Sequence, residues 1–182
     1  SVAVSVSVAN PNIVWAGVTM SSSATSSHKI RLSKDNGQTF TSTTGTLPSQ
    51  FTNHYISGLQ ASAVSESRAF VLLSLAGKGK VFKTDDFGVN FTDITGFTQG
   101  ENRGFPDVPV HSLIEMPFDP NIIWVGTDIG VFETTDAGAT WHILAGLPPF
   151  SVWQMKIVDN QVVMATHGRG VWTATVPQLA DY

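Results

Sequence analysis

The 182-residue chain has no cysteine, and it is poor in charged residues and in long apolar runs. Without cysteine it cannot be one of the small extracellular modules that disulfides hold together. Charged residues make up 13% of it, against about 25% in ordinary soluble domains. The net charge of −4 argues against nucleic acid or an anionic membrane as a partner, because both select basic patches. No apolar run reaches about 18 residues, the length that a membrane-spanning helix needs.

Helical periodicity is also missing, and short β-strand patterns take its place. Residues 1–9 alternate between valine and a small residue, which is typical of a strand. Further segments with strand character are 13–18, 28–32, 39–43, 55–64, 68–75, 80–84, 90–94, 110–116, 122–126, 131–135, 140–144, 152–158, 161–166 and 171–176. We therefore expect an all-β protein.

An eight-residue motif recurs three times along the chain. Its pattern is Ser/Thr-x-Asp-x-Gly-x-Thr/Asn-aromatic, and it occupies residues 33–40, 84–91 and 134–141. The central aspartates, Asp35, Asp86 and Asp136, lie 51 and 50 residues apart. A fixed period of about 20 to 50 residues marks a repeat architecture.

Four-stranded units that repeat at this period describe the blades of a β-propeller. We predict antiparallel blades at 1–50, 51–108, 109–150 and 151–177, followed by a tail at 178–182, all within one propeller segment. The fourth unit has three strand patterns and no motif. The sequence thus predicts three full blades plus an incomplete fourth, and we expect them to belong to a larger ring.

The three motifs resemble the Asp-box (BNR) repeats of sialidase-like, sortilin-like and xyloglucanase-like propellers. Residues 164–172 resemble the closing blade of bacterial secreted BNR-repeat proteins. The resemblance implies the C-terminal blades of an exported or cell-surface bacterial protein. The partners that it implies are the remaining N-terminal blades of the same propeller, either covalently joined or separated by a nick in the chain, or a second copy of this chain. The alternative is a small four-bladed ring. The repeat is specific for blade architecture and says little about a ligand.

The motif residues have a structural interpretation. A short aspartate side chain accepts hydrogen bonds from nearby backbone N–H groups and so closes a turn. Gly37, Gly88 and Gly138 supply positive φ, and Phe40, Phe91 and Trp141 begin the outer strands. Calcium is the alternative, but it needs about six to eight oxygens and each motif offers one regular carboxylate.

We expect no cofactor and no metal. The histidines show no close ligand spacing; they are His28, His54, His111, His142 and His167.

Candidate ligand-binding residues lie on the loops that face away from the motifs. Because strand direction alternates within a blade, the loops between second and third strands share a face with the connections into the next inner strand. These loops are 19–28, 76–79, 127–130 and 167–170, and the connections are 45–54, 95–111 and 145–151. Binding residues concentrate on such loops over a rigid scaffold. The candidates are Arg103, Asp107, His111, Asp128, His167 and Arg169. The structural alternative is an Arg–Asp link inside loop 100–111, with Arg169 paired to Asp107 or Asp128.

Enzymatic activity of this chain alone is not expected. Sialidases use an arginine triad and a tyrosine nucleophile, whereas the tyrosines here are Tyr55 and the final Tyr182. A xyloglucanase-like hydrolase needs two carboxylates across a cleft. Asp107, Asp128 and Glu101 are weak candidates, and in such enzymes the pair is split between two propellers.

The favoured hypothesis is an extracellular binding or scaffold propeller for carbohydrate or protein. The alternative is the C-terminal propeller part of a glycoside hydrolase. A sortilin-like receptor is disfavoured because its cysteine-rich module is missing.

Overall fold

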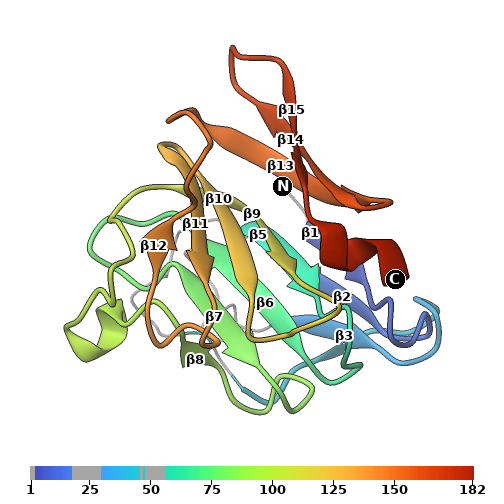
Figure 1. Ribbon diagram of the computed structural model, residues 1–182. Coiled ribbons are helices and arrows are strands. Elements are labelled where there is room, and N and C mark those ends of the chain that lie inside the picture. The colour runs from blue at the N-terminus through green and yellow to red at the C-terminus, as the bar shows by residue number, and fades with distance from the viewer. Residues whose placement is uncertain (1–2, 18–29, 46, 48–55) are drawn as a thin grey trace.

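The computed structural model describes residues 3–17, 30–45, 47 and 56–182, which form four antiparallel sheets (Figure 1). The first sheet contains β1 (Ala3–Val6), β2 (Val14–Gly17), β3 (Arg31–Ser33) and β4 (Thr41–Ser42). The second contains β5 (Ile56–Ala61), β6 (Ala69–Leu73), β7 (Val81–Thr84) and β8 (Thr92–Asp93). The third contains β9 (Val110–Glu115), β10 (Ile123–Thr127), β11 (Gly130–Thr134) and β12 (His142–Ile143). The last contains β13 (Val152–Val158), β14 (Gln161–Thr166) and β15 (Val171–Thr175).

The predicted fold class is confirmed: in each sheet the strands follow chain order, and the last sheet has three strands where the others have four. The described residues contain no α-helix, only the 3₁₀ helices η2 (Phe97–Gln99) and η3 (Pro177–Asp181), and no helix among them is long and apolar enough to cross a membrane. The outer strands are shorter than predicted, at two residues each, because the motif turn includes the positions before them. His28, His54 and Tyr55, with loop 19–28 and nearly all of loop 45–54, lie outside the described residues.

Neighbouring sheets pack face to face around three apolar clusters. The cluster between the first two sheets centres on Trp15 and Phe82, and the next centres on Phe70 and Phe132. The third lies between the last two sheets and also takes Leu179 from η3, so the predicted tail is packed rather than free. Each sheet therefore buries its apolar faces against its neighbours, as in repeat architectures.

Each motif closes a turn around its aspartate. In the third motif, Asp136 Oδ1 accepts from the backbone N–H of Thr140 at 2.8 Å, and Oδ2 accepts from the Thr140 hydroxyl at 2.6 Å. Thr134 Oγ1 donates to Asp136 Oδ1 at 2.7 Å and accepts from Gly138 N–H at 2.9 Å. The first two motifs repeat this arrangement around Asp35 and Asp86. The carboxylate is thus fully used within the turn.

The second and third motifs also hold neighbouring sheets together. Gly138 has φ +95°, and a Cβ there would lie 2.7 Å from Ile94 Cβ in the sheet before it. The indole Nε1 of Trp141 donates to the Ile94 carbonyl at 2.9 Å. Gly88 abuts Thr43 in the same way. The glycine and the aromatic residue of a motif therefore form part of the contact with the preceding sheet.

The first motif differs from the other two in this respect. Around Gly37 a Cβ would meet only the ring of Phe40 at 4.0 Å, and Phe40 itself is 36% exposed. Among the described residues, Phe40 therefore does not pack between two sheets as Trp141 does. The first motif has the same turn as the others but no described sheet in front of it.

Candidate functional site at one end of the central hollow

The innermost strands of all four sheets line a hollow of about 750 Å³. Ser5 of β1, Gly58 of β5, Ser112 of β9 and Gln154 of β13 contribute to its wall. Its volume is within the range of about 300 to 1,000 Å³ that is usual for ligand sites. His111 and Trp153 line one end, where β9 and β13 begin, and Glu115 and Ile157 line the other.

A polar network joins four side chains at the first end. His111 Nε2 lies 2.7 Å from Asp128 Oδ1, and the hydroxyl of Ser151 donates to the same oxygen at 3.0 Å. The indole Nε1 of Trp153 donates to Ser151 Oγ at 2.8 Å. The third and fourth sheets both contribute, so the network forms only when they pack together.

Two imidazoles flank the Trp153 indole. The His111 ring lies 5.5 Å from it, centroid to centroid, with an interplanar angle of 27°. The His167 ring lies 5.2 Å away at 16°, and the backbone N–H of His167 donates to the Ser151 carbonyl at 3.0 Å. Trp153 is nevertheless 55% exposed. We call Asp128, His111, Ser151, Trp153 and His167 the His–Trp cluster.

A β-bulge explains why this tryptophan is exposed. The pairing of β13 with β14 shifts between Val152 and Gln154, which takes Trp153 out of the alternation that buries Val152 and Met155. Bulges of this kind redirect a side chain next to a site. Without the bulge, an indole in an inner strand would be expected to pack against a neighbouring sheet.

The Asp128 carboxylate is held in its ionised form. The hydrogen bond from His111 lowers its pKa below the usual value, with a smaller contribution from Ser151, and together these outweigh the partial burial that would raise it. Ser151 donates to Asp128 and not to a histidine, so the three residues do not form a nucleophilic triad.

The structure brings three of the predicted candidates together, His111, Asp128 and His167, and places the others elsewhere. Asp107 accepts from the Gly77 N–H and pairs with the buried Lys80 at 2.6 Å, and the hydrogen bond from Lys80 lowers its pKa. The carbonyl of Arg169 accepts from Trp172 Nε1 at 3.0 Å. The alternative of an Arg169 pair with either aspartate is wrong, because Asp107 pairs with Lys80 and Asp128 with His111.

Arg103 and Glu101 lie beside the third motif. Arg103 Nε is 3.5 Å from Glu101 Oε2, so the expected Arg–Asp link inside this loop is an Arg–Glu contact. Arg103 Nη1 reaches the Gly138 carbonyl at 3.4 Å, and its own carbonyl accepts from the Trp141 N–H at 2.7 Å. Both contacts join the loop to the third motif rather than to the His–Trp cluster.

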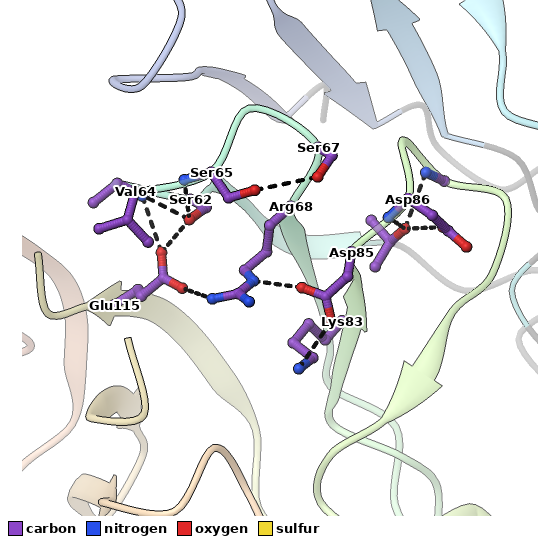
Figure 2. A network of polar contacts seen from close by, with 12 residues as sticks. Ser62, Val64, Ser65, Ser67, Arg68, Lys83, Asp85, Asp86 and Glu115 are labelled. Atoms are coloured by element: carbon purple, nitrogen blue, oxygen red, sulfur yellow. Dashed lines mark hydrogen bonds and ion pairs between the residues drawn. The ribbon is translucent and has the colours of Figure 1, made fainter. Parts of the chain in front are cut away.

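A buried carboxylate at the other end of the hollow was not anticipated from sequence. Glu115 accepts from the Ser62 hydroxyl, from the Ala63 N–H at 3.0 Å and from Arg68 Nη1 at 2.8 Å. Figure 2 shows Arg68 between Glu115 and Asp85, whose Oδ1 it reaches through Nε at 2.5 Å. Every oxygen of Glu115 is already used, so this network joins the second and third sheets and leaves no free group for chemistry.

Within the described part of the chain, no group of three or more histidine, aspartate or glutamate side chains is placed to hold a metal ion. His28 and His54 lie outside that part.

Comparison with known proteins supports the fold. No family profile matches the chain, and no curated protein sequence matches it. It is similar to the GH74 enzyme of Niastella koreensis, with a TM-score of 0.71 and 18% identity over 97% of this chain and 28% of that one. The GH74 xyloglucanase of Xanthomonas campestris gives 0.71 and 15% over 97% and 29%. The β-propeller domain of Cps50 (Swd1) from Myceliophteria thermophila gives 0.59 and 9% over 98% and 53%.

The class of protein defined by these observations is a β-propeller. Identities of this size establish the fold alone. The chain spans less than a third of the length of the two GH74 structures. An incomplete propeller fits both the three-stranded last sheet and this partial coverage.

Proposed function

We propose that this chain is an Asp-box β-propeller module that binds carbohydrate at the His–Trp cluster. The supporting observation is the exposed Trp153 indole at one end of a hollow of about 750 Å³. Because the His111 and His167 rings already stack on this indole, a sugar would contact the part of the indole that they leave exposed. Asp128 and the two imidazoles supply acceptors and donors for the hydroxyl groups at the ring edge.

The proposal includes the blade division predicted from the sequence and a location outside a bacterial cell, exported or on the surface. Of the predicted binding residues, it assigns His111, Asp128 and His167 to the ligand. Arg103 and Asp107 are assigned to the scaffold, since the contacts of their side chains lie within the fold, and Arg169 is left out because only its backbone carbonyl has a contact there. A protein ligand remains the second class, because an exposed tryptophan is also common at protein interfaces.

A role as part of a glycoside hydrolase is the alternative, favoured by the likeness to the two GH74 propellers. A hydrolase needs one carboxyl group with a raised pKa as the acid. The pKa values of Asp128 and Asp107 are both lowered, by His111 and Lys80 respectively. In this alternative Asp128 acts as the base or nucleophile, and the acid comes from another part of the enzyme.

The test is titration of the protein with a panel of soluble glucans, including xyloglucan, while tryptophan emission is followed. Trp15, Trp124 and Trp141 are buried, whereas Trp153 and Trp172 are exposed, so the part of the emission change that is lost in Trp153→Ala reports on Trp153. We expect saturable binding that Trp153→Ala weakens at least tenfold, an expected loss of about 1.4 kcal/mol. Ile143→Ala, which removes an exposed side chain of the neighbouring sheet, is the matched control.

Two results would overturn the carbohydrate proposal. One is the absence of any emission change with every glucan in the panel. The other is equal affinity of the wild type and Trp153→Ala. Release of reducing sugar by the protein, abolished in Asp128→Asn, would instead support the hydrolase alternative.

A further inference from the structure

The turn between β14 and β15, residues 167–170, adjoins the His–Trp cluster. In Figure 1 it is the turn at the top of the view. Its first residue, His167, stacks on Trp153. Arg169 follows two positions later and is exposed, as are the glycines on either side of it. The backbone that positions the His167 ring therefore also carries the Arg169 side chain.

Two carbonyl oxygens of this turn are bonded within the last sheet. The Gly170 carbonyl accepts from the Thr166 N–H at 3.1 Å and from the Thr166 hydroxyl at 2.6 Å. The Arg169 carbonyl accepts from Trp172 Nε1 at 3.0 Å. These bonds hold the backbone at Arg169, and they occupy the acceptors that would otherwise offset the charge of its side chain.

The donors of the turn have no corresponding partners. Among the described residues, the backbone N–H groups of Gly168, Arg169 and Gly170 have no acceptor. The Arg169 guanidinium likewise has no hydrogen bond or ion pair to a described residue. The turn therefore leaves three successive N–H groups and a cation available to solvent, and such a combination attracts an anion.

The one carboxylate of the His–Trp cluster does not neutralise this cation. Asp128 Oδ1 is bonded to His111 Nε2 and to the Ser151 hydroxyl. Asp128 thus interacts with the first of the two imidazoles, whereas Arg169 follows the second along the chain. A ligand at the exposed part of the Trp153 indole would meet a carboxylate near His111 and an unpaired cation beyond His167.

We propose that the carbohydrate bound at the His–Trp cluster is an acidic one, whose carboxylate is held by the Arg169 guanidinium and the N–H groups of residues 168–170. This proposal rests on the proposed function and names the ligand class of the same site. A guanidinium matches a carboxylate through two parallel hydrogen bonds. A uronic acid has the required chemistry, because one ring carries both the hydroxyl groups and the carboxylate.

The test compares two glucose oligomers of equal length and linkage. They are cellohexaose and its C6-oxidised form, in which the rings carry carboxylates. Binding to the whole chain is measured by isothermal titration calorimetry at neutral pH and low salt. We expect the oxidised form to bind at least tenfold more tightly, and we expect this preference to shrink as salt is added, because exposed charges are screened.

Two arginine variants locate the preference. Arg169→Gln removes the cation from the turn and should lower the affinity for the oxidised oligomer to about that for cellohexaose. Arg31→Gln is the matched control, because Arg31 is an exposed arginine on β3 of the first sheet. It should keep the full preference for the oxidised form. Circular dichroism confirms that both variants are folded.

Equal affinity of the wild type for the two oligomers overturns the acidic-ligand proposal and leaves the carbohydrate proposal in place. A preference that persists in Arg169→Gln has the same consequence. Hexaglutamate is the last probe, and if it binds as tightly as the oxidised oligomer, the turn recognises carboxylates without a sugar and the acidic-ligand proposal is wrong. Failure of both oligomers to bind overturns the carbohydrate proposal as well.

Discussion

At the scale of single residues, each of the three motif aspartates closes one turn. Each accepts hydrogen bonds from the backbone and from the side chain of the residue four positions on. Hydrogen bonds to the ionised form favour it, so the pKa falls. The Ser33 and Thr39 side chains lower the pKa of Asp35 to about 2. For Asp136, hydrogen bonds from Thr140 and Thr134 outweigh slight burial and also bring the pKa to about 2.

This lowering predicts a stability that is lost in acid. A carboxyl group whose pKa is lower when folded contributes stability above its ordinary pKa of 3.8, and that contribution disappears as the pH falls toward about 2. We expect the free energy of unfolding in urea to fall between about pH 4 and pH 2. Asp136→Asn should cost about 1 kcal/mol at neutral pH and flatten the curve in that window. Parallel curves for the wild type and Asp136→Asn would contradict this.

At the scale of elements, the same motif turn contributes differently to stability depending on whether another sheet packs against it. The motif glycines have similar left-handed φ values, +83° at Gly37 and +95° at Gly138. Gly138 touches the preceding sheet through Ile94, whereas Gly37 meets only Phe40 of its own turn. The motif therefore has two separable functions, turn closure and contact between sheets.

Alanine at the two glycines separates these functions. Gly37→Ala should cost about 1 to 2 kcal/mol, the penalty of a left-handed conformation for a residue with a Cβ. Gly138→Ala adds a clash with Ile94 and should cost roughly 2 to 4 kcal/mol. The measurement is the midpoint of urea unfolding for each variant. Equal losses would show that Gly138 does not contribute to packing between the sheets.

At the scale of the whole molecule, each sheet packs against its neighbours. Such an arrangement is stabilised by the sum of its units and of the contacts between them. The contact between the second and third sheets includes an ion pair between Arg68 and Glu115. It is the only ion pair among the described residues whose carboxylate is fully buried. Breaking this pair should weaken the packing of these two sheets against each other.

Glu115→Gln tests the contact between the second and third sheets. It removes the buried one of the two carboxylate partners of Arg68, while Asp85 remains, and should lower the free energy of unfolding by about 2 kcal/mol. Glu101→Gln, whose carboxylate is largely exposed beside Arg103, is the matched control and should change it by less than about 1 kcal/mol. Urea unfolding of both variants at neutral pH gives the comparison. A loss below that of the control would mean that the pair is solvated rather than buried.

Much of the fold could be predicted from the sequence, because strands, turns and repeats are recorded in local patterns. Alternation locates β1, and the motif spacing locates the repeated units before any contact is known. The candidate site could be predicted only in part. His111, Asp128 and His167 were expected on one face, but Trp153 and Ser151 were missed, because the bulge that exposes the indole depends on pairing with β14.

The sequence by itself determined the all-β class, the strand order and the turn chemistry of the motifs, since these depend on residues close together in the chain. Only the tertiary structure decided which aspartate pairs with which basic side chain, which motif aromatic residue is buried and where the hollow lies. These properties depend on contacts between residues far apart in the sequence, such as His111 with Trp153 or Arg68 with Glu115. Packing of neighbouring sheets brings them together, and no local pattern records that packing.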